Sequence, residues 1–158
     1  MKSIDKEFKL NKFINKLISL KKNNLCIGFT NGCFDLLHQG HLYSISEAKK
    51  KCDYLIIGLN SDISVANLKG VGRPIDNQAN RILKLSKLDD VDAIIIFHDD
   101  TPLRLIKDIK PDVLFKGIDY IDKEIVGSTF IKENGGKVVL IDFLDGYSTS
   151  NLIKNSSL

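Results

Sequence analysis

The sequence lacks any long apolar run. No stretch of its 158 residues is long and apolar enough to cross a membrane, and charged side chains interrupt the first residues, so neither a membrane partner nor a signal peptide is expected. Cysteine is scarce, because only Cys26, Cys33 and Cys52 occur, and they form neither an even disulfide set nor a CxxC pair. We therefore expect reduced thiols in a cytoplasmic protein.

An excess of one charge sign is also missing. The chain has 23 basic and 20 acidic residues, which give a formal net charge of +3. This balance is too even to predict a nucleic-acid surface, so no nucleic-acid partner is expected. Apolar residues make up 43% and charged residues 27%, as in ordinary globular proteins, and the length suits one domain with one core. No internal repeat or linker divides the chain.

Apolar periodicity predicts a helix near the start. The residues that form its apolar stripe, at helical spacing, are Leu10, Phe13, Ile14, Leu17 and Ile18. We interpret residues 1–24 as an N-terminal helical extension and residues 25–158 as the main domain.

After residue 24, short apolar runs alternate with helical stretches. The runs are almost continuously apolar, which is typical of strands buried on both faces of a parallel sheet. They cover Leu25–Phe29, Tyr54–Leu59, Ala93–Phe97, Val113–Phe115 and Val138–Ile141. The predicted helices are His41–Lys51, Arg81–Leu88, Pro102–Ile109, Ile125–Asn134 and Ser150–Lys154. This alternation predicts a single α/β domain with a doubly wound sheet of about five mainly parallel strands and helices on both faces. Ligands are then expected beyond the carboxyl ends of the strands.

The segment from Thr30 to His41 follows the first predicted strand and leads into a helix. Gly32 and Gly40 allow the backbone to come close to a ligand, and a helix N-terminus attracts phosphate. His38 and His41 lie on either side of Gly40, so both imidazoles can donate hydrogen bonds to one anion. This pattern predicts a polyphosphate site.

Other interpretations of the two histidines are weaker. They could be core or capping residues, but they are two of only three histidines and share one glycine-bracketed turn. A zinc site lacks further ligands nearby. A dinucleotide-binding turn lacks its GxGxxG, and a Walker A loop is absent as well.

The segments Gly32-x-Phe34-Asp35 and His38-x-Gly40-His41 resemble the signature of the cytidylyltransferase-like superfamily of nucleotidyltransferases, which implies a Rossmann-like fold. Further segments resemble one branch, the D-glycero-β-D-manno-heptose 1-phosphate adenylyltransferases. These segments are Asn60-Ser61-Asp62, Leu68-Lys69-Gly70, Arg73-Pro74, Val91-Asp92, Thr101-Pro102, Lys116-Gly117-x-Asp119-Tyr120 and Ser148-Thr149-x-Asn151.

The resemblance implies a reaction and its partners. AMP would pass from ATP to the heptose 1-phosphate, which gives ADP-heptose and pyrophosphate for lipopolysaccharide inner-core biosynthesis. ATP is then a substrate, Mg²⁺ accompanies the triphosphate, and no permanent metal site made of protein groups is expected. In many bacteria this domain follows a sugar kinase, and we expect the present sequence to be the stand-alone form. Relatives commonly form symmetric assemblies, so a homo-oligomer is expected.

The resemblance also implies roles for matching residues. His38 and His41 would bind the phosphates and support the departing pyrophosphate, and Lys69 would join them as a catalytic residue. The nucleotide-binding set would be Thr30, Asn31, Gly32, Phe34, Gly40, Gly117, Asp119, Ser148 and Thr149. Lys69 and Arg73 would bridge the sugar phosphate and ATP, and Arg81 is a further candidate for the same anionic site.

Each role has a plainer alternative. Lys69 and Arg73 could be solvated charges in a loop around Gly70 and Gly72, and Arg81 could be a surface charge. Asp119 could be a turn residue and Ser148 a helix cap. His98, near two aspartates, is assigned no role.

One departure from the superfamily pattern concerns positive charge. Many relatives have an arginine shortly before the serine-threonine motif, but Leu144-Asp145-Gly146-Tyr147 contains no cation. The triphosphate must therefore rely on other positive groups or on metal.

Sister activities remain as alternatives. They are cytidylyltransferases for glycerol 3-phosphate or phosphoethanolamine, FMN adenylyltransferase, and, in another class, a nucleotide-binding module without catalysis. The segments 68–70 and 116–120 favour the heptose branch, while the choice of adenine over cytosine rests on the resemblance alone.

Overall fold

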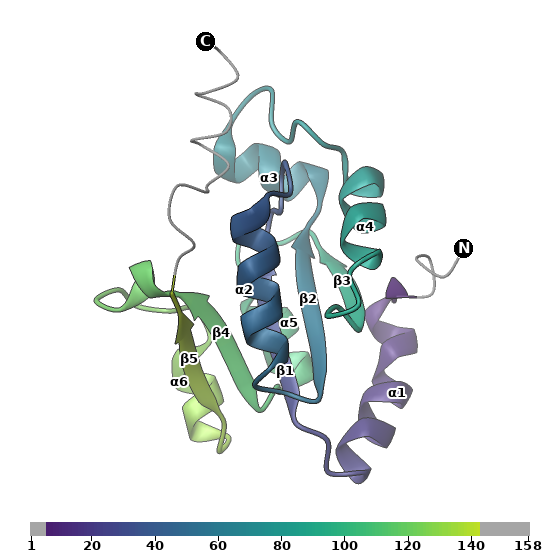
Figure 1. Ribbon diagram of the computed structural model, residues 1–158, viewed down its shortest axis with the longest axis vertical. Helices are drawn as coiled ribbons and strands as arrows, with labels where there is room; N and C mark the ends of the chain where they lie inside the picture. Colours follow the sequence, from purple (N-terminus) through teal and green to yellow (C-terminus); the bar gives the residue numbers. More distant parts are fainter. Residues whose placement is uncertain (1–5, 143–158) are drawn as a thin grey trace.

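Five parallel strands form the sheet of the computed structural model, which describes residues 6–142 (Figure 1). In chain order they are β1 (Ile27–Gly32), β2 (Tyr54–Asn60), β3 (Ala93–Phe97), β4 (Val113–Gly117) and β5 (Lys137–Ile141). They lie in the order β3-β2-β1-β4-β5, and each neighbouring pair is parallel. The chain thus builds outward from β1 to β3 and then returns to the other side of β1. The reversal between β1 and β4 is the topological switch point, where ligands of such sheets bind.

Helices cover both faces of this sheet. They are α1 (Leu10–Lys22), α2 (Gln39–Lys49), α3 (Asp62–Lys69), α4 (Gln78–Ser86), α5 (Leu103–Ile109), α6 (Ser128–Glu133) and the short 3₁₀ helix η2 (Ile118–Tyr120). One core cluster joins α1, α5 and α6 to the sheet, and the other joins α2 and α4 to its opposite face. Alternate residues of β2 serve the two clusters, since Ile56 belongs to the first and Leu55 and Ile57 to the second. The predicted doubly wound, Rossmann-like fold is confirmed.

The predicted N-terminal helix is confirmed as α1, and it packs into the core. Phe13 is completely buried and Leu17 is nearly so. Just before the helix, the backbone N–H of Phe8 donates to the carbonyl of Ile94, a residue of the edge strand β3, at 3.0 Å. That residues 25–158 form the main domain and residues 1–24 an extension stays a prediction. Within residues 6–142, no helix combines the length and apolar character needed to span a membrane.

Some element boundaries differ from those predicted. The first strand runs from Ile27 to Gly32 rather than from 25 to 29, because its pairing with β2 continues until Gly32 lies opposite Leu59. α3 was not predicted, although Ser61 caps its start by accepting from the N–H of Ser64 at 3.2 Å. The predicted helix 150–154, together with Ser148 and Thr149, lies outside the described residues.

Candidate active site

The two motif histidines lie together at the N-terminus of α2. His38 is the N-cap residue, and its Nδ1 accepts a hydrogen bond from the N–H of Gly40 at 3.1 Å. The Nδ1 of His41 accepts from the N–H of His38 at 3.2 Å, so each imidazole satisfies a backbone donor of the first turn. The rings are stacked with their centroids 3.8 Å apart. The capping interpretation is therefore compatible with the phosphate interpretation, because capping uses only one nitrogen of each ring.

The capping bonds also fix where the ring protons lie. A nitrogen that accepts a hydrogen bond carries no proton, so each neutral ring has its proton on Nε2 and presents an N–H donor there. Burial lowers the pKa of His41 to about 4, with further lowering from His38 and Lys69. Burial also lowers the pKa of His38. At neutral pH the pair thus provides two neutral donors.

A cavity of about 260 Å³ lies beside these rings, where β1 and β4 end. Seven of the predicted site residues line it, namely Thr30, Asn31, Gly32, Phe34, His41, Lys69 and Gly117. The predicted residues His38, Gly40, Arg73, Arg81 and Asp119 are outside this lining. The cavity occupies the switch point of the sheet, as expected for a ligand site in this fold.

Five lining residues were not assigned a role from the sequence. They are Cys33, Asp35, Ser44, Lys116 and Tyr120. Ser44 lies one helical turn after His41, so the helical period could have indicated it. Lys116 and Tyr120 belong to a segment that carries the family resemblance, which is the signal that pointed to them.

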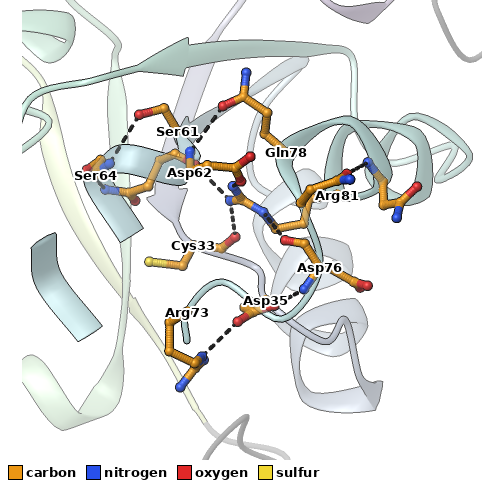
Figure 2. A network of polar contacts seen from close by, with 12 residues as sticks. Cys33, Asp35, Ser61, Asp62, Ser64, Arg73, Asp76, Gln78 and Arg81 are labelled. Carbon is orange, nitrogen blue, oxygen red and sulfur yellow. Dashed lines mark hydrogen bonds and ion pairs between the residues drawn. The ribbon is translucent and has the colours of Figure 1, made fainter. Parts of the chain in front are cut away.

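Lys69 and Arg73 are held by different means. Lys69 is the last residue of α3 rather than part of a loop, because Gly70, with a φ of 98°, ends the helix only after it. The Nε of Arg73 donates to Asp35 Oδ2 at 2.9 Å. Asp35 also accepts from the N–H groups of Ile75 and Asp76, both at 2.9 Å. These contacts hold the segment between α3 and α4 against the loop between β1 and α2, which contains Asp35 (Figure 2).

The charge of Asp35 is stabilised by the same contacts. Burial by itself would raise the pKa of this carboxyl group, but the N–H donors of Asp76 and Ile75 and the Arg73 guanidinium hold it below its usual range. Asp35 is thus an anion already bound by protein donors. Within residues 6–142, no group of three or more His, Cys, Asp or Glu side chains could hold a metal ion.

Arg81 is a buried residue of α4, with 1% of its surface exposed. Its Nη1 donates to the carbonyl of Cys33 at 2.8 Å and to that of Asn60 at 2.7 Å. Its Nη2 donates to Asp62 Oδ1 at 2.8 Å, and its Nε to the carbonyl of Asp76 at 3.0 Å (Figure 2). These bonds favour a structural role over the substrate-binding role that the sequence suggested.

Known proteins are similar to this chain in sequence. A family model described as cytidylyltransferase-like matches residues 29–154. A curated relative, the bifunctional protein HldE of Nitrobacter winogradskyi, is 50% identical over 140 residues, which cover 89% of this chain and 29% of the relative. The protein of the same name from Caulobacter vibrioides is 51% identical over 133 residues, or 84% of this chain and 28% of the relative. The chain thus spans less than a third of the length of these relatives.

Two solved structures resemble the fold. One is a lipopolysaccharide core biosynthesis protein from Thermoplasma volcanium, with a TM-score of 0.61 and 26% identity over 78% of this chain and 99% of that one. The other is a pantoate-beta-alanine ligase from Francisella tularensis, complexed with beta-gamma ATP and beta-alanine, with a TM-score of 0.61. It is 17% identical over 93% of this chain and 71% of that one, and so supports the fold alone.

Proposed function

This chain belongs to the cytidylyltransferase-like family, and on that premise we propose that it transfers AMP from ATP to D-glycero-β-D-manno-heptose 1-phosphate and releases pyrophosphate. One observation carries the transferase part of the proposal: two stacked imidazoles stand at a helix N-terminus, beside a cavity that His41 and Lys69 line. The heptose substrate is supported by the sequence segments described above, by the similarity to the HldE proteins and by the lipopolysaccharide-related structure.

The proposed step is an in-line displacement at the α-phosphorus of ATP. An oxygen of the sugar 1-phosphate forms the new P–O bond, and the bond from the α-phosphorus to the bridging oxygen of the β-phosphate breaks. The attacking oxygen is already anionic near neutral pH, so no general base is needed. The barrier comes from repulsion between the anions and from charge that accumulates on the pyrophosphate, so the protein contributes positioning and electrostatic stabilisation.

The protein groups fit this task. The Nε2–H donors of His38 and His41 and the N-terminus of α2 would hold the β- and γ-phosphates, and Lys69 would neutralise charge between ATP and the acceptor. Mg²⁺ would arrive with the triphosphate as part of the substrate, since the cavity offers N–H donors and its carboxylate, Asp35, is bound by Arg73. Because ATP is consumed, we expect the reaction in the cytoplasm, and we expect a homo-oligomer.

A pyrophosphate-release assay tests the proposal. ATP and CTP are each paired with heptose 1-phosphate, glycerol 3-phosphate, phosphoethanolamine and FMN. We expect pyrophosphate release with ATP and heptose 1-phosphate. The His38→Ala variant serves as the control and should be inactive. Faster turnover of CTP with another acceptor would show that the protein is the corresponding cytidylyltransferase. Faster turnover of ATP with FMN would show that it is an FMN adenylyltransferase. Tight ATP binding without turnover of any acceptor would indicate a regulatory module.

A further inference from the structure

Lys116 lines the cavity from β4 and has no role in the mechanism above. It is the last residue but one of β4, the strand that neighbours β1. Its Nζ donates to Asn31 Oδ1, on β1, at 2.9 Å and lies 5.2 Å from the ring centroid of Tyr120. All three residues line the cavity. The amide oxygen and the aromatic ring therefore hold the ammonium group at the cavity.

Among the partners that the structure describes, the ammonium group of Lys116 has no carboxylate in an ion pair with it. Burial lowers its pKa, and Asp119 offsets only part of this effect. Lys116 is partly buried, and a cation withdrawn from water is costly unless an anion compensates it. An anion that enters the cavity would supply this compensation.

The charges around the cavity reinforce this point. Lys69 is a second lysine in the lining of the cavity. The carboxylate in this lining, that of Asp35, accepts from Arg73 and from two backbone N–H groups. The side chains available to a ligand are therefore cations and neutral donors.

We propose that Lys116 is a catalytic residue that contacts the phosphate oxygens at the point of transfer, with Asn31 holding its ammonium group in position. The inference rests on the proposed function. The imidazoles approach the phosphates from α2, and Lys116 approaches from β4, on the other side of the end of β1. While the acceptor oxygen bonds to the α-phosphorus and pyrophosphate departs, Lys116 stays protonated and gives up no proton.

Three variants test this role. Lys116→Met keeps the length of the side chain and removes the charge, and Lys116→Arg keeps the charge. Lys123→Met is the matched control, because Lys123 lies over the same Tyr120 ring at 5.6 Å but is exposed and does not line the cavity. Pyrophosphate release gives kcat and KM for both substrates, and melting temperatures are taken with and without ATP.

We expect Lys116→Met to lower kcat/KM by about 100-fold or more, as the loss of one transition-state donor does elsewhere. Its melting temperature without ATP should be unchanged or higher, because a partly buried cation has been removed, while the rise caused by ATP should shrink. Lys116→Arg should recover part of the activity, and Lys123→Met should match the wild type.

The possible failures are distinguishable. If the wild type releases pyrophosphate and Lys116→Met does so as fast, the role of Lys116 is overturned and the proposed function stands. Loss of activity together with a lower melting temperature without ATP would show a structural lysine, which also overturns the role. A wild type inactive with every acceptor would refute the proposed function, and the role of Lys116 in transfer with it.

Discussion

At the scale of single residues, each motif histidine uses its two nitrogens for different tasks. The Nδ1 of His41 accepts from the backbone N–H of His38, while its Nε2 is the proposed phosphate donor. The oxygen of an asparagine side chain can replace Nδ1 as an acceptor, but the side chain is too short to replace Nε2. We therefore expect His41→Asn to keep the stability of the wild type and to lower kcat by about 10²–10³-fold in the pyrophosphate assay.

His41→Ala is the comparison for this variant. It removes both nitrogens, so it should lose the activity and, in addition, about 1 kcal/mol of unfolding free energy in urea titrations, because a helix cap is lost. Near-full turnover by His41→Asn would show that the Nε2 donor is not needed.

The pKa of His41 also predicts a pH dependence of stability. In the folded protein this pKa is about 4, whereas in an unfolded chain it is about 6.5. Between these values the unfolded state binds more protons, so the contribution of His41 to stability is complete above about pH 6.5 and declines as the pH falls toward 4. The slope from this group is at most about 1.4 kcal/mol per pH unit.

Carboxyl groups titrate in part of the same range, so the measurement is a difference. Unfolding free energies of the wild type and of His41→Asn are compared at pH 7, 6 and 5. The two should be about equally stable at pH 7, and the wild type should become less stable relative to His41→Asn as the pH falls. His98→Asn, which changes an exposed histidine, serves as the control. A constant difference over this range would contradict a depressed pKa at His41.

At the scale of elements, Arg81 joins α4 to the segments around the site. It bonds the carbonyl of Cys33 after β1, that of Asn60 at the end of β2, and the first residue of α3, Asp62. Lysine cannot reproduce this fork of donors, so Arg81→Lys leaves buried acceptors unsatisfied. We expect the unfolding free energy to fall by about 3 kcal/mol or more.

Urea titration measures the effect of Arg81→Lys. Arg104→Lys, at an exposed position of α5, is the matched control and should differ little from the wild type. An Arg81→Lys variant with unchanged stability but a raised KM would instead support the substrate-binding role suggested by the sequence.

Most elements could be predicted because the sheet is buried on both faces. Continuous apolar runs such as 93–97 then mark strands directly. α3 was missed for a matching reason. The large apolar residues of α3, Ile63 and Leu68, are 69% and 52% exposed, whereas its buried residues are Ser64 and Val65. The spacing of apolar residues therefore does not reveal the inner face of this helix.

At the scale of the whole molecule, the site is assembled from segments that are distant in sequence. The motif 30–41 could be recognised because it is local, but the contact between Lys116 and Asn31 joins residues 85 positions apart. That contact depends on β4 lying next to β1, which apolar periodicity does not specify. The burial of Arg81 likewise arises from loops that only the folded sheet brings together.

Whether α1 is a detachable extension depends on how it packs in the whole molecule. Phe13 is fully buried and belongs to the core cluster on the face covered by α5 and α6, and its ring stacks on Tyr54 of β2 with the centroids 6.2 Å apart. Removing such a ring leaves a cavity between helix and sheet. Phe13→Ala should therefore lower the unfolding free energy by about 3–5 kcal/mol in urea titrations.

Ile18→Ala is the control on the same helix, since Ile18 is 48% exposed, and it should cost far less than Phe13→Ala. The activity of the folded fraction should stay the same in both variants, because α1 contributes no residue to the cavity lining. A loss below about 1 kcal/mol for Phe13→Ala, less than a typical large-to-small core substitution, would mean that α1 is a dispensable extension. A loss in the expected range would instead place the start of the domain within α1, before residue 25, because the core on that face of the sheet would then be incomplete without this helix.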